Sequence, residues 1–130
     1  MPLPRVLIVD DDDAVRLVLR RWFTRRGWYA EEASNGDQAR AFLAPERGAH
    51  FDVILCDVRM PEMSGPEFYD WLSVARPSEL SHLVFTTGDA TAYGVAEFLR
   101  ASGCQVLEKP FELNALWTIA ERLRDDTVTV

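Results

Sequence analysis

The hydrophobic pattern of the chain alternates short apolar runs with longer amphipathic segments. An unbroken run of apolar, often β-branched residues is typical of a strand that is buried on both faces. On this basis the sequence predicts strands at 6–9, 29–33, 51–56, 83–87 and 105–107. The strand at 29–33 has Glu31 and Glu32 at its centre, so we expect it at an edge of the sheet.

The segments between these strands carry apolar residues at helical spacing. The stripe of the first segment is formed by Val15, Val18, Leu19, Trp22 and Phe23. Gly27 then ends that helix. Further helices are predicted at 38–43, 67–74, 92–99 and 113–123, and a loop at 45–50. Strands that alternate with helices indicate a parallel sheet covered on both faces. We expect one domain at 1–124, followed by a C-terminal tail at 125–130.

Composition and charge narrow the class of protein. Of the 130 residues, 48% are hydrophobic and 27% are charged, which suits a globular domain with a core. The net charge of −7 disfavours a nucleic-acid-binding domain, since such domains usually present a basic face. The sequence shows no signal peptide and no apolar stretch of about 20 residues, so we expect a cytoplasmic protein without membrane contact. Cys56 and Cys104 lie in apolar runs, so we expect buried free thiols.

Polar side chains follow four of the predicted strands at their carboxyl ends. Asp10 and Asp11 follow the first strand, and Asp57 follows the third. Thr87 ends the fourth strand, and Lys109 comes after the fifth. Because ligands of open parallel sheets bind beyond the carboxyl ends of the strands, we expect these residues in one pocket.

Three carboxylates in one pocket repel one another, and a bound divalent cation removes that conflict. Hard oxygen ligands favour Mg²⁺, which binds phosphate oxygens together with one or two carboxylates. A lysine ammonium and a threonine hydroxyl beside the cation suit the transfer of a phosphoryl group onto a carboxylate. The remaining acids of the run, Asp12 and Asp13, are expected to cap the first helix and to lie at the positive end of its dipole.

Four segments together carry a resemblance to a known family. They are VLIVDDDD at 6–13, DVILCDVRMPEMSG at 52–65, VFTTGD at 84–89 and VLEKPF at 106–111. In this order and spacing they resemble the receiver domain of two-component response regulators, of which the chemotaxis regulators are members. The resemblance implies a doubly wound (βα)5, flavodoxin-like α/β fold. Such a fold is a three-layer sandwich around a parallel five-stranded sheet with strand order 2-1-3-4-5.

The resemblance also implies which residues bind the phosphoryl group and the metal. Asp57 matches the family's phosphoacceptor, and Asp11 matches a direct metal ligand. Asp10 matches the acid that reaches the metal through a water molecule, and the backbone carbonyl of Arg59 matches the third protein ligand. The implied cofactor is Mg²⁺, with Mn²⁺ as a substitute. Lys109 matches the family's lysine.

Two further positions bear on switching. Thr87 resembles the hydroxyl that turns toward the phosphoryl group. Val106 stands where the family often has Tyr or Phe, and an aliphatic side chain cannot swing a ring between exposed and buried states. The resemblance therefore implies phosphorylation chemistry but leaves the aromatic half of the conformational relay in question.

Arg59 and Asp89 lie two residues after the acceptor and two after the switch threonine. In the family these positions flank the water that attacks the phosphoryl group. We therefore expect them to set the lifetime of the phosphoryl group and to pair with each other across the pocket mouth.

The implied partner is a histidine kinase or a histidine phosphotransfer protein, which the family docks over the first helix and the loop after the last strand. The residues expected on that face are Ala14, Leu17, Arg21, Pro110 and Phe111. A contact with a second copy or an output partner is expected through the face formed by the fourth and fifth helices. Tyr93 and Phe98 lie off the apolar stripe of the fourth helix.

Two alternatives stay open on the sequence. A haloacid-dehalogenase-like phosphatase also uses an aspartate after its first strand, often as D-x-D, which Asp10 and Asp12 match. A pseudo-receiver would be an interaction module without phosphorylation. On the receiver interpretation, the chain is a signalling switch or relay that catalyses only its own phosphorylation and dephosphorylation. His50 and His82 are isolated in the sequence, so we assign no role to them.

Overall fold

A computed structural model describes residues 3–92 and 94–128. The strands are β1 (Arg5–Val9), β2 (Tyr29–Ala33), β3 (Val53–Asp57), β4 (Leu83–Thr87) and β5 (Gln105–Glu108). The α-helices are α1 (Asp13–Arg25), α2 (Gly36–Leu43), α3 (Gly65–Ala75), α4 (Val95–Ser102) and α5 (Leu113–Val128). Two 3₁₀ helices, η1 (Pro45–Arg47) and η2 (Pro77–His82), complete the described elements.

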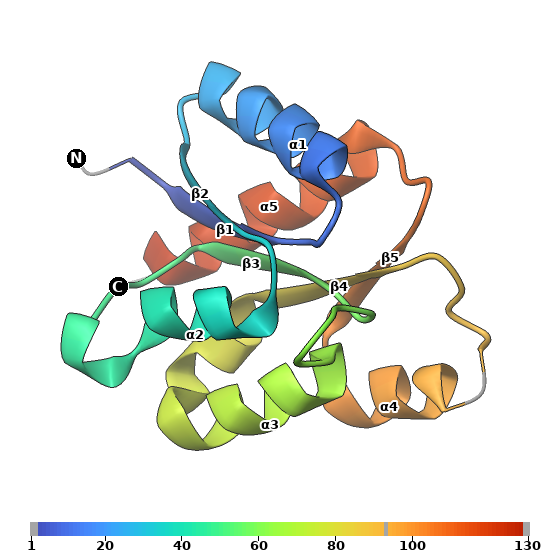
Figure 1. The fold of residues 1–130 in the computed structure, drawn as a ribbon. Coiled ribbons are helices and arrows are strands. Elements are labelled where there is room, and N and C mark those ends of the chain that lie inside the picture. Colours follow the sequence, from blue (N-terminus) through green and yellow to red (C-terminus); the bar gives the residue numbers. More distant parts are fainter. Residues whose placement is uncertain (1–2, 93, 129–130) are drawn as a thin grey trace.

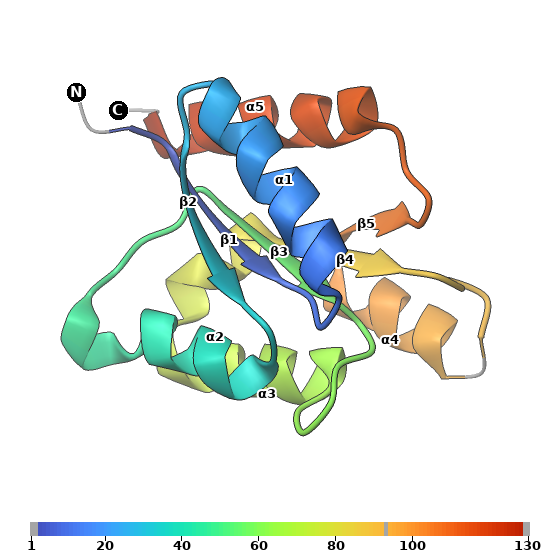
Figure 2. The same ribbon diagram turned by 45° about the horizontal axis from the view of Figure 1, so that its top comes forward.

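The strands form one parallel sheet in the order β2-β1-β3-β4-β5. Helices α1 and α5 cover one face of the sheet, and α2, α3 and α4 cover the other, as Figure 1 and the turned view of Figure 2 both show. The predicted doubly wound, flavodoxin-like three-layer fold and its strand order are therefore confirmed. The expected edge position of 29–33 is also confirmed, since β2 is the outer strand beside β1.

Alternate residues of each central strand fill two separate cores. In β1, Val6 and Ile8 pack with Leu19 and Phe23 of α1 on one face of the sheet. Leu7 and Val9 pack on the other face, among side chains of α2 and α3. This explains why the central strands read as unbroken apolar runs, because both of their faces are buried.

Several element bounds differ from the sequence prediction. Helix α4 begins at Val95 rather than at 92, because Gly94 before it has a φ of +80°, which no helical residue adopts. The segment predicted as a loop at 45–50 contains η1, which starts at Pro45. Helix α5 runs to Val128, past residue 124 where we expected the domain to end. The division into a domain and a tail stays a prediction.

The apolar stripe predicted for the first helix is wrong at one position. Leu19 and Phe23 are buried, but Val18 is 58% exposed. Successive residues are about 100° apart around a helix, so Val18 lies at the margin of the stripe centred on Leu19 and Trp22.

No helix in the part of the chain that the structure describes is long and apolar enough to cross a membrane.

Candidate phosphoacceptor site

The carboxyl ends of β1, β3 and β5 bring two acids and one base into contact. Lys109 Nζ lies 2.6 Å from Asp10 Oδ2 and 2.9 Å from Asp57 Oδ2. These residues are 99 and 52 positions away from Lys109 in the chain, and the sheet order alone places them together. The predicted convergence of Asp10, Asp57 and Lys109 is therefore confirmed.

Backbone donors hold the second oxygen of each carboxylate. The N–H of Asp12 donates to Asp10 Oδ1 at 2.9 Å, and the N–H of Arg59 donates to Asp57 Oδ1 at 3.0 Å. Asp10 is only 3% exposed and Asp57 only 9%. Both carboxylates are thus fixed in position with one oxygen on the main chain and the other on the Lys109 ammonium.

Asp11 completes an acidic cluster at the mouth of the pocket. It is exposed, and one carboxylate oxygen from each of Asp10, Asp11 and Asp57 lies within 4.8 Å of the others. An all-oxygen, carboxylate-rich donor set of this kind fits a hard divalent cation such as Mg²⁺. The residues present therefore fit the metal that the sequence implies.

Burial and charge act in opposite directions on the two central groups. Burial raises the pKa of Asp57, although the hydrogen bonds from Lys109 and from the Arg59 N–H partly offset it. Burial lowers the pKa of Lys109, but its hydrogen bonds to Asp10 and Asp57 outweigh that effect and leave the pKa above its usual value. The hydrogen bonds to Asp10 and Asp57 thus favour the charged ammonium form of Lys109.

Thr87 lies at the end of β4 and is 3% exposed. Its carbonyl oxygen accepts a hydrogen bond from the N–H of Lys109 at 2.7 Å, and its Oγ1 accepts one from the N–H of Asp89 at 3.2 Å. The backbone of Thr87 therefore holds the backbone of Lys109 in place. The role of the Thr87 hydroxyl as a switch stays a prediction. The peptide bond between Lys109 and Pro110 is cis.

The expected pairing of Arg59 with Asp89 stays a prediction, since no direct ion pair joins these two side chains among the described residues. Asp89 Oδ1 instead accepts hydrogen bonds from the backbone N–H and the hydroxyl of Thr91, at 2.9 and 2.7 Å. These two bonds lower the pKa of Asp89, with a smaller effect from the charge of Arg59. The Asp89 carboxylate therefore has its hydrogen-bond donors within its own turn and does not need one from across the pocket mouth.

The other two aspartates of the run act as the sequence predicts. Asp12 caps α1, since its carboxylate accepts from the N–H groups of Ala14 and Val15. Asp13 lies in the first turn and forms an ion pair with Arg16. The four consecutive acids thus divide into two in the pocket and two at the helix start.

An apolar groove of about 570 Å³ lies next to Lys109. It is lined by Ala14, Val15, Val18, Leu19, Lys109, Pro110, Phe111 and Leu113. Three residues of the predicted partner face, Ala14, Pro110 and Phe111, are in this set. The other two, Leu17 and Arg21, are exposed on α1 outside the lining. The prediction omitted Val18, because its spacing assigned it to the core.

Two other predictions about single residues have mixed outcomes. Cys56 is fully buried in the core, as predicted, whereas Cys104 is only half-buried. Phe98, expected on an output face, packs edge-on against Phe85 and Tyr69, with ring centroids 5.2 and 5.8 Å apart. Tyr93, named with it, lies outside the described residues.

The sequence interpretation missed a second polar cluster, formed by His50, Glu79 and His82 at the amino ends of the strands. His50 and Glu79 are 29 positions apart in the chain, so no short-range sequence pattern predicts their contact. Only the i, i+3 spacing of Glu79 and His82 is visible in the sequence, and it is too common to indicate a site.

Comparison with known proteins agrees with this geometry. A family model described as response regulator receiver domain matches residues 6–121. The regulatory protein AtoC of Escherichia coli K12 is 36% identical over 119 residues, which are 91% of this chain and 24% of AtoC. The response regulator MprA of Mycolicibacterium vanbaalenii is 38% identical over 116 residues, which are 89% of this chain and 48% of MprA. The chemotaxis protein CheY4 of Vibrio cholerae has a crystal structure that matches with a TM-score of 0.78 at 28% identity, covering 94% of this chain and 99% of that one.

The chain therefore belongs to the response regulator receiver domain family. This places it in two-component signalling and gives no support to the phosphatase alternative. The chain spans about a quarter of AtoC and about half of MprA, so the activities of those whole proteins are not transferred to it.

Proposed function

We propose that this receiver domain accepts a phosphoryl group on Asp57 from a phosphohistidine, carried by a histidine kinase or a histidine phosphotransfer protein. The observation that carries the proposal is the 2.9 Å contact between Asp57 Oδ2 and Lys109 Nζ, with Asp10 and Asp11 beside it. A carboxylate in an acidic pocket is a good acceptor only where positive charge offsets the charge of the incoming group. Lys109 supplies part of that charge.

The transfer uses groups that the fold already holds in place. A carboxylate oxygen of Asp57 forms a bond to phosphorus while the P–N bond to the donor imidazole breaks, and the leaving nitrogen keeps the electron pair. Burial makes the Asp57 carboxylate more basic than an exposed one, which favours its attack. Lys109 can then move its Asp57 hydrogen bond onto a phosphoryl oxygen while Asp10 still holds the ammonium at 2.6 Å.

Asp11, Asp57 and the carbonyl of Arg59 would hold Mg²⁺ or Mn²⁺ directly, and Asp10 would reach it through a water molecule. The bound cation would offset negative charge on the phosphoryl oxygens. We also propose that the Thr87 hydroxyl, whose oxygen accepts from the Asp89 N–H, donates its own hydrogen to the phosphoryl group.

We assign the lifetime of the phosphoryl group to Arg59 and Asp89, both exposed near the pocket mouth. Because Thr91 holds Asp89, the two act as separate groups in this proposal rather than as an ion pair. Val106 packs on the core beside Phe85 of the neighbouring strand and cannot supply an aromatic switch. The output then depends on Thr87 alone or on onward transfer of the phosphoryl group.

The groove beside Lys109 is the proposed docking face for the phosphohistidine donor. Ala14 and Val18 line it from α1, and Pro110 and Phe111 line it from the loop after β5. An apolar groove that ends at the pocket lysine suits a partner that must bring a phosphoimidazole to Asp57. The output contact through α4 and α5 and the cytoplasmic location remain parts of the proposal.

Phosphorylation by a small donor tests the proposal without a partner. Wild-type protein incubated with acetyl phosphate and Mg²⁺ should gain the mass of one phosphoryl group, and EDTA or Asp57→Asn should abolish the gain. A pseudo-receiver would gain no mass under any of these conditions, which would overturn the proposal.

A further inference from the structure

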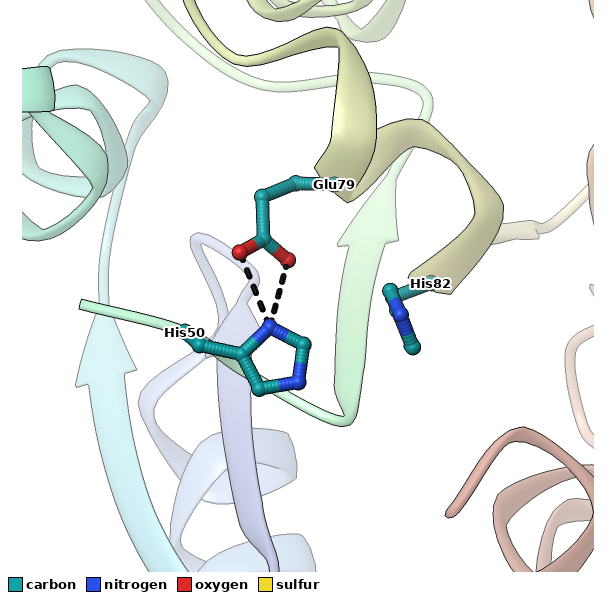
Figure 3. Close-up of side chains that lie close together, drawn as sticks. All are labelled: His50, Glu79 and His82. Carbon is teal, nitrogen blue, oxygen red and sulfur yellow. Dashed lines mark hydrogen bonds and ion pairs between the residues drawn. The ribbon is translucent and has the colours of Figure 1, made fainter. Parts of the chain in front are cut away.

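His50, Glu79 and His82 form a compact polar cluster at the amino ends of the strands. His50 precedes β3, while Glu79 and His82 belong to η2, which leads into β4 (Figure 3). His50 Nδ1 lies 2.9 Å from Glu79 Oε1 and 3.1 Å from Oε2. One ligand atom from each of the three residues lies within 4.8 Å of the others.

Asp52 lies beside both imidazole rings. Its carbonyl oxygen lies 2.9 Å from His82 Nδ1. A carbonyl oxygen only accepts, so Nδ1 carries the hydrogen, and Nε2 of neutral His82 carries the lone pair. The Asp52 carboxylate lies 3.8 Å from His50 Nε2, on the side of the ring away from Glu79. The Asp52 carbonyl thus holds the far nitrogen of His82, which is how proteins prepare a histidine to bind a metal, and the Asp52 carboxylate lies near the far nitrogen of His50.

Burial and charge at the cluster favour a cation. Glu79 is 2% exposed and His82 is 7% exposed, which is unusual for ionisable side chains on a short turn. Arg76 Nη2 donates to Glu79 Oε1 at 2.9 Å. The carboxylate of Asp52 lies 3.8 Å from His50 Nε2 and adds a second negative charge beside that ring.

We propose that His50 Nδ1, His82 Nε2 and a Glu79 oxygen form a binding site for a zinc-class transition-metal cation. Binding moves the His50 hydrogen from Nδ1 to Nε2, where the Asp52 carboxylate can accept it. Ligand atoms around a tetrahedral Zn²⁺ are roughly 3.3 Å apart, from metal–ligand lengths of about 2.0–2.1 Å. The separations of His50 Nδ1 from the Glu79 oxygens, 2.9 and 3.1 Å, are already near this value, and the three residues offer ligand atoms within 4.8 Å of one another.

The proposed site is independent of the phosphoacceptor pocket. It lies at the other end of the sheet, roughly 17 Å away along five-residue strands. Two imidazoles and one carboxylate select Zn²⁺, Co²⁺ or Ni²⁺ over Mg²⁺, which prefers oxygen ligands alone. The cation would tie the segment before β3 to η2.

Titration of untagged protein with Co²⁺ and Zn²⁺ tests the proposal. Co²⁺ should produce visible absorption bands at one equivalent, and Zn²⁺ should displace them. His50→Gln should weaken Zn²⁺ binding by more than about 100-fold, beyond the loss typical of outer-shell changes. Asp11→Asn, which alters only the acidic pocket, should leave the Co²⁺ spectrum and the Zn²⁺ affinity unchanged.

His50 is half-exposed, so His50→Gln keeps the fold, and far-ultraviolet circular dichroism can verify this. His82→Asn and Glu79→Gln should repeat the loss of binding, while phosphorylation of Asp57 should persist in His50→Gln. Absence of Co²⁺ bands in the wild type would overturn the proposal. Binding that His50→Gln retains and Asp11→Asn removes would overturn it as well, since the acidic pocket would then be the only transition-metal site.

Discussion

At the scale of single residues, Lys109 decides whether the pocket is stable. Its ammonium is the hydrogen-bonded counter-charge between Asp10 and Asp57, both of which are nearly buried. A buried carboxylate that loses its partner keeps the full cost of its desolvation. The residue that prepares the site for a phosphoryl group is therefore also the residue that permits two acids to share it.

Replacement of Lys109 by Met should lower the free energy of unfolding by about 2 kcal/mol in the absence of metal, because two carboxylates are then left unpaired. Urea unfolding with and without Mg²⁺ would measure this. Mg²⁺ should restore more stability to the variant than it adds to the wild type. Adding Asp57→Asn to Lys109→Met should recover part of the loss, and a double variant no more stable than the single one would contradict the explanation.

The run of four aspartates gives a matched pair of variants. On the proposed assignment Mg²⁺ binds the folded pocket and not the unfolded chain, so at 100 times its dissociation constant it should stabilise the protein by about 2.7 kcal/mol. Asp11→Asn should remove most of this gain, whereas Asp13→Asn, at the helix start beside Arg16, should leave it nearly intact. Thermal unfolding with added Mg²⁺ measures both, and equal gains in the two variants would refute the division of the run.

At the scale of elements, two helices begin with a glycine that leaves no room for a side chain. A Cβ on Gly65 of α3 would lie 2.9 Å from Val58 Cα, just after the phosphoacceptor strand. A Cβ on Gly36 of α2 would lie 2.7 Å from Met63 Cβ, which is bonded directly to the main chain. Neither atom can move without moving the main chain, so the starts of both helices are fixed against the loop that follows β3.

Gly65→Ala should therefore destabilise the protein by about 2 kcal/mol, as overpacking against fixed atoms does. Gly36→Ala should lose a similar amount, whereas Gly88→Ala, where an added Cβ meets nothing within 4 Å, should change stability by less than about 1 kcal/mol. Chemical unfolding of the three variants would measure the contrast. Losses at Gly65 and Gly36 no larger than the loss at Gly88 would mean that the loop after β3 can move aside.

The sequence predicts elements best where one local rule decides them. Unbroken apolar runs locate β1, β3 and β4, and Asp12 marks the start of α1 because its carboxylate caps the helix. Val18 was assigned to the core but is exposed. A residue at the margin of an apolar stripe is buried only if a neighbouring element covers it, and the sequence of α1 does not show this. The contacts of Asp89 with Thr91 and of His50 with Glu79 also escaped, since hydrogen-bond choice in loops depends on the finished fold.

At the scale of the whole molecule, the two groups of polar side chains lie at opposite ends of the parallel strands. The carboxyl ends of the strands hold Asp10, Asp57 and Lys109, and the groove of α1 and Phe111 opens beside them. The amino ends hold the His50 cluster. The proposed docking face and the proposed phosphoacceptor thus lie together at the carboxyl ends of the strands, while the proposed cation site lies at the amino ends.

Surface substitutions can separate docking from chemistry. Val18 is 58% exposed in the groove, and Val74 is 85% exposed on α3, across the sheet from α1. Val18→Asp should slow phosphotransfer from a phosphorylated histidine phosphotransfer protein by about tenfold or more, the effect of losing about 1.4 kcal/mol at a docking face. Val74→Asp should not change it.

Both variants should react with acetyl phosphate at the wild-type rate, because neither residue touches the pocket. Radiolabelled phosphotransfer assays would compare the two donors. If Val18→Asp slowed both reactions equally, the groove would be part of the chemical site and not a docking face.

The central claim is that Asp57 carries the phosphoryl group, and reductive trapping tests it most directly. Borohydride reduces an acyl phosphate on aspartate to homoserine, which peptide mass spectrometry locates to a single position. After incubation with acetyl phosphate and Mg²⁺, the account predicts homoserine at position 57 and none in the Asp10–Asp13 run. Homoserine at position 10, or at no position, would contradict it.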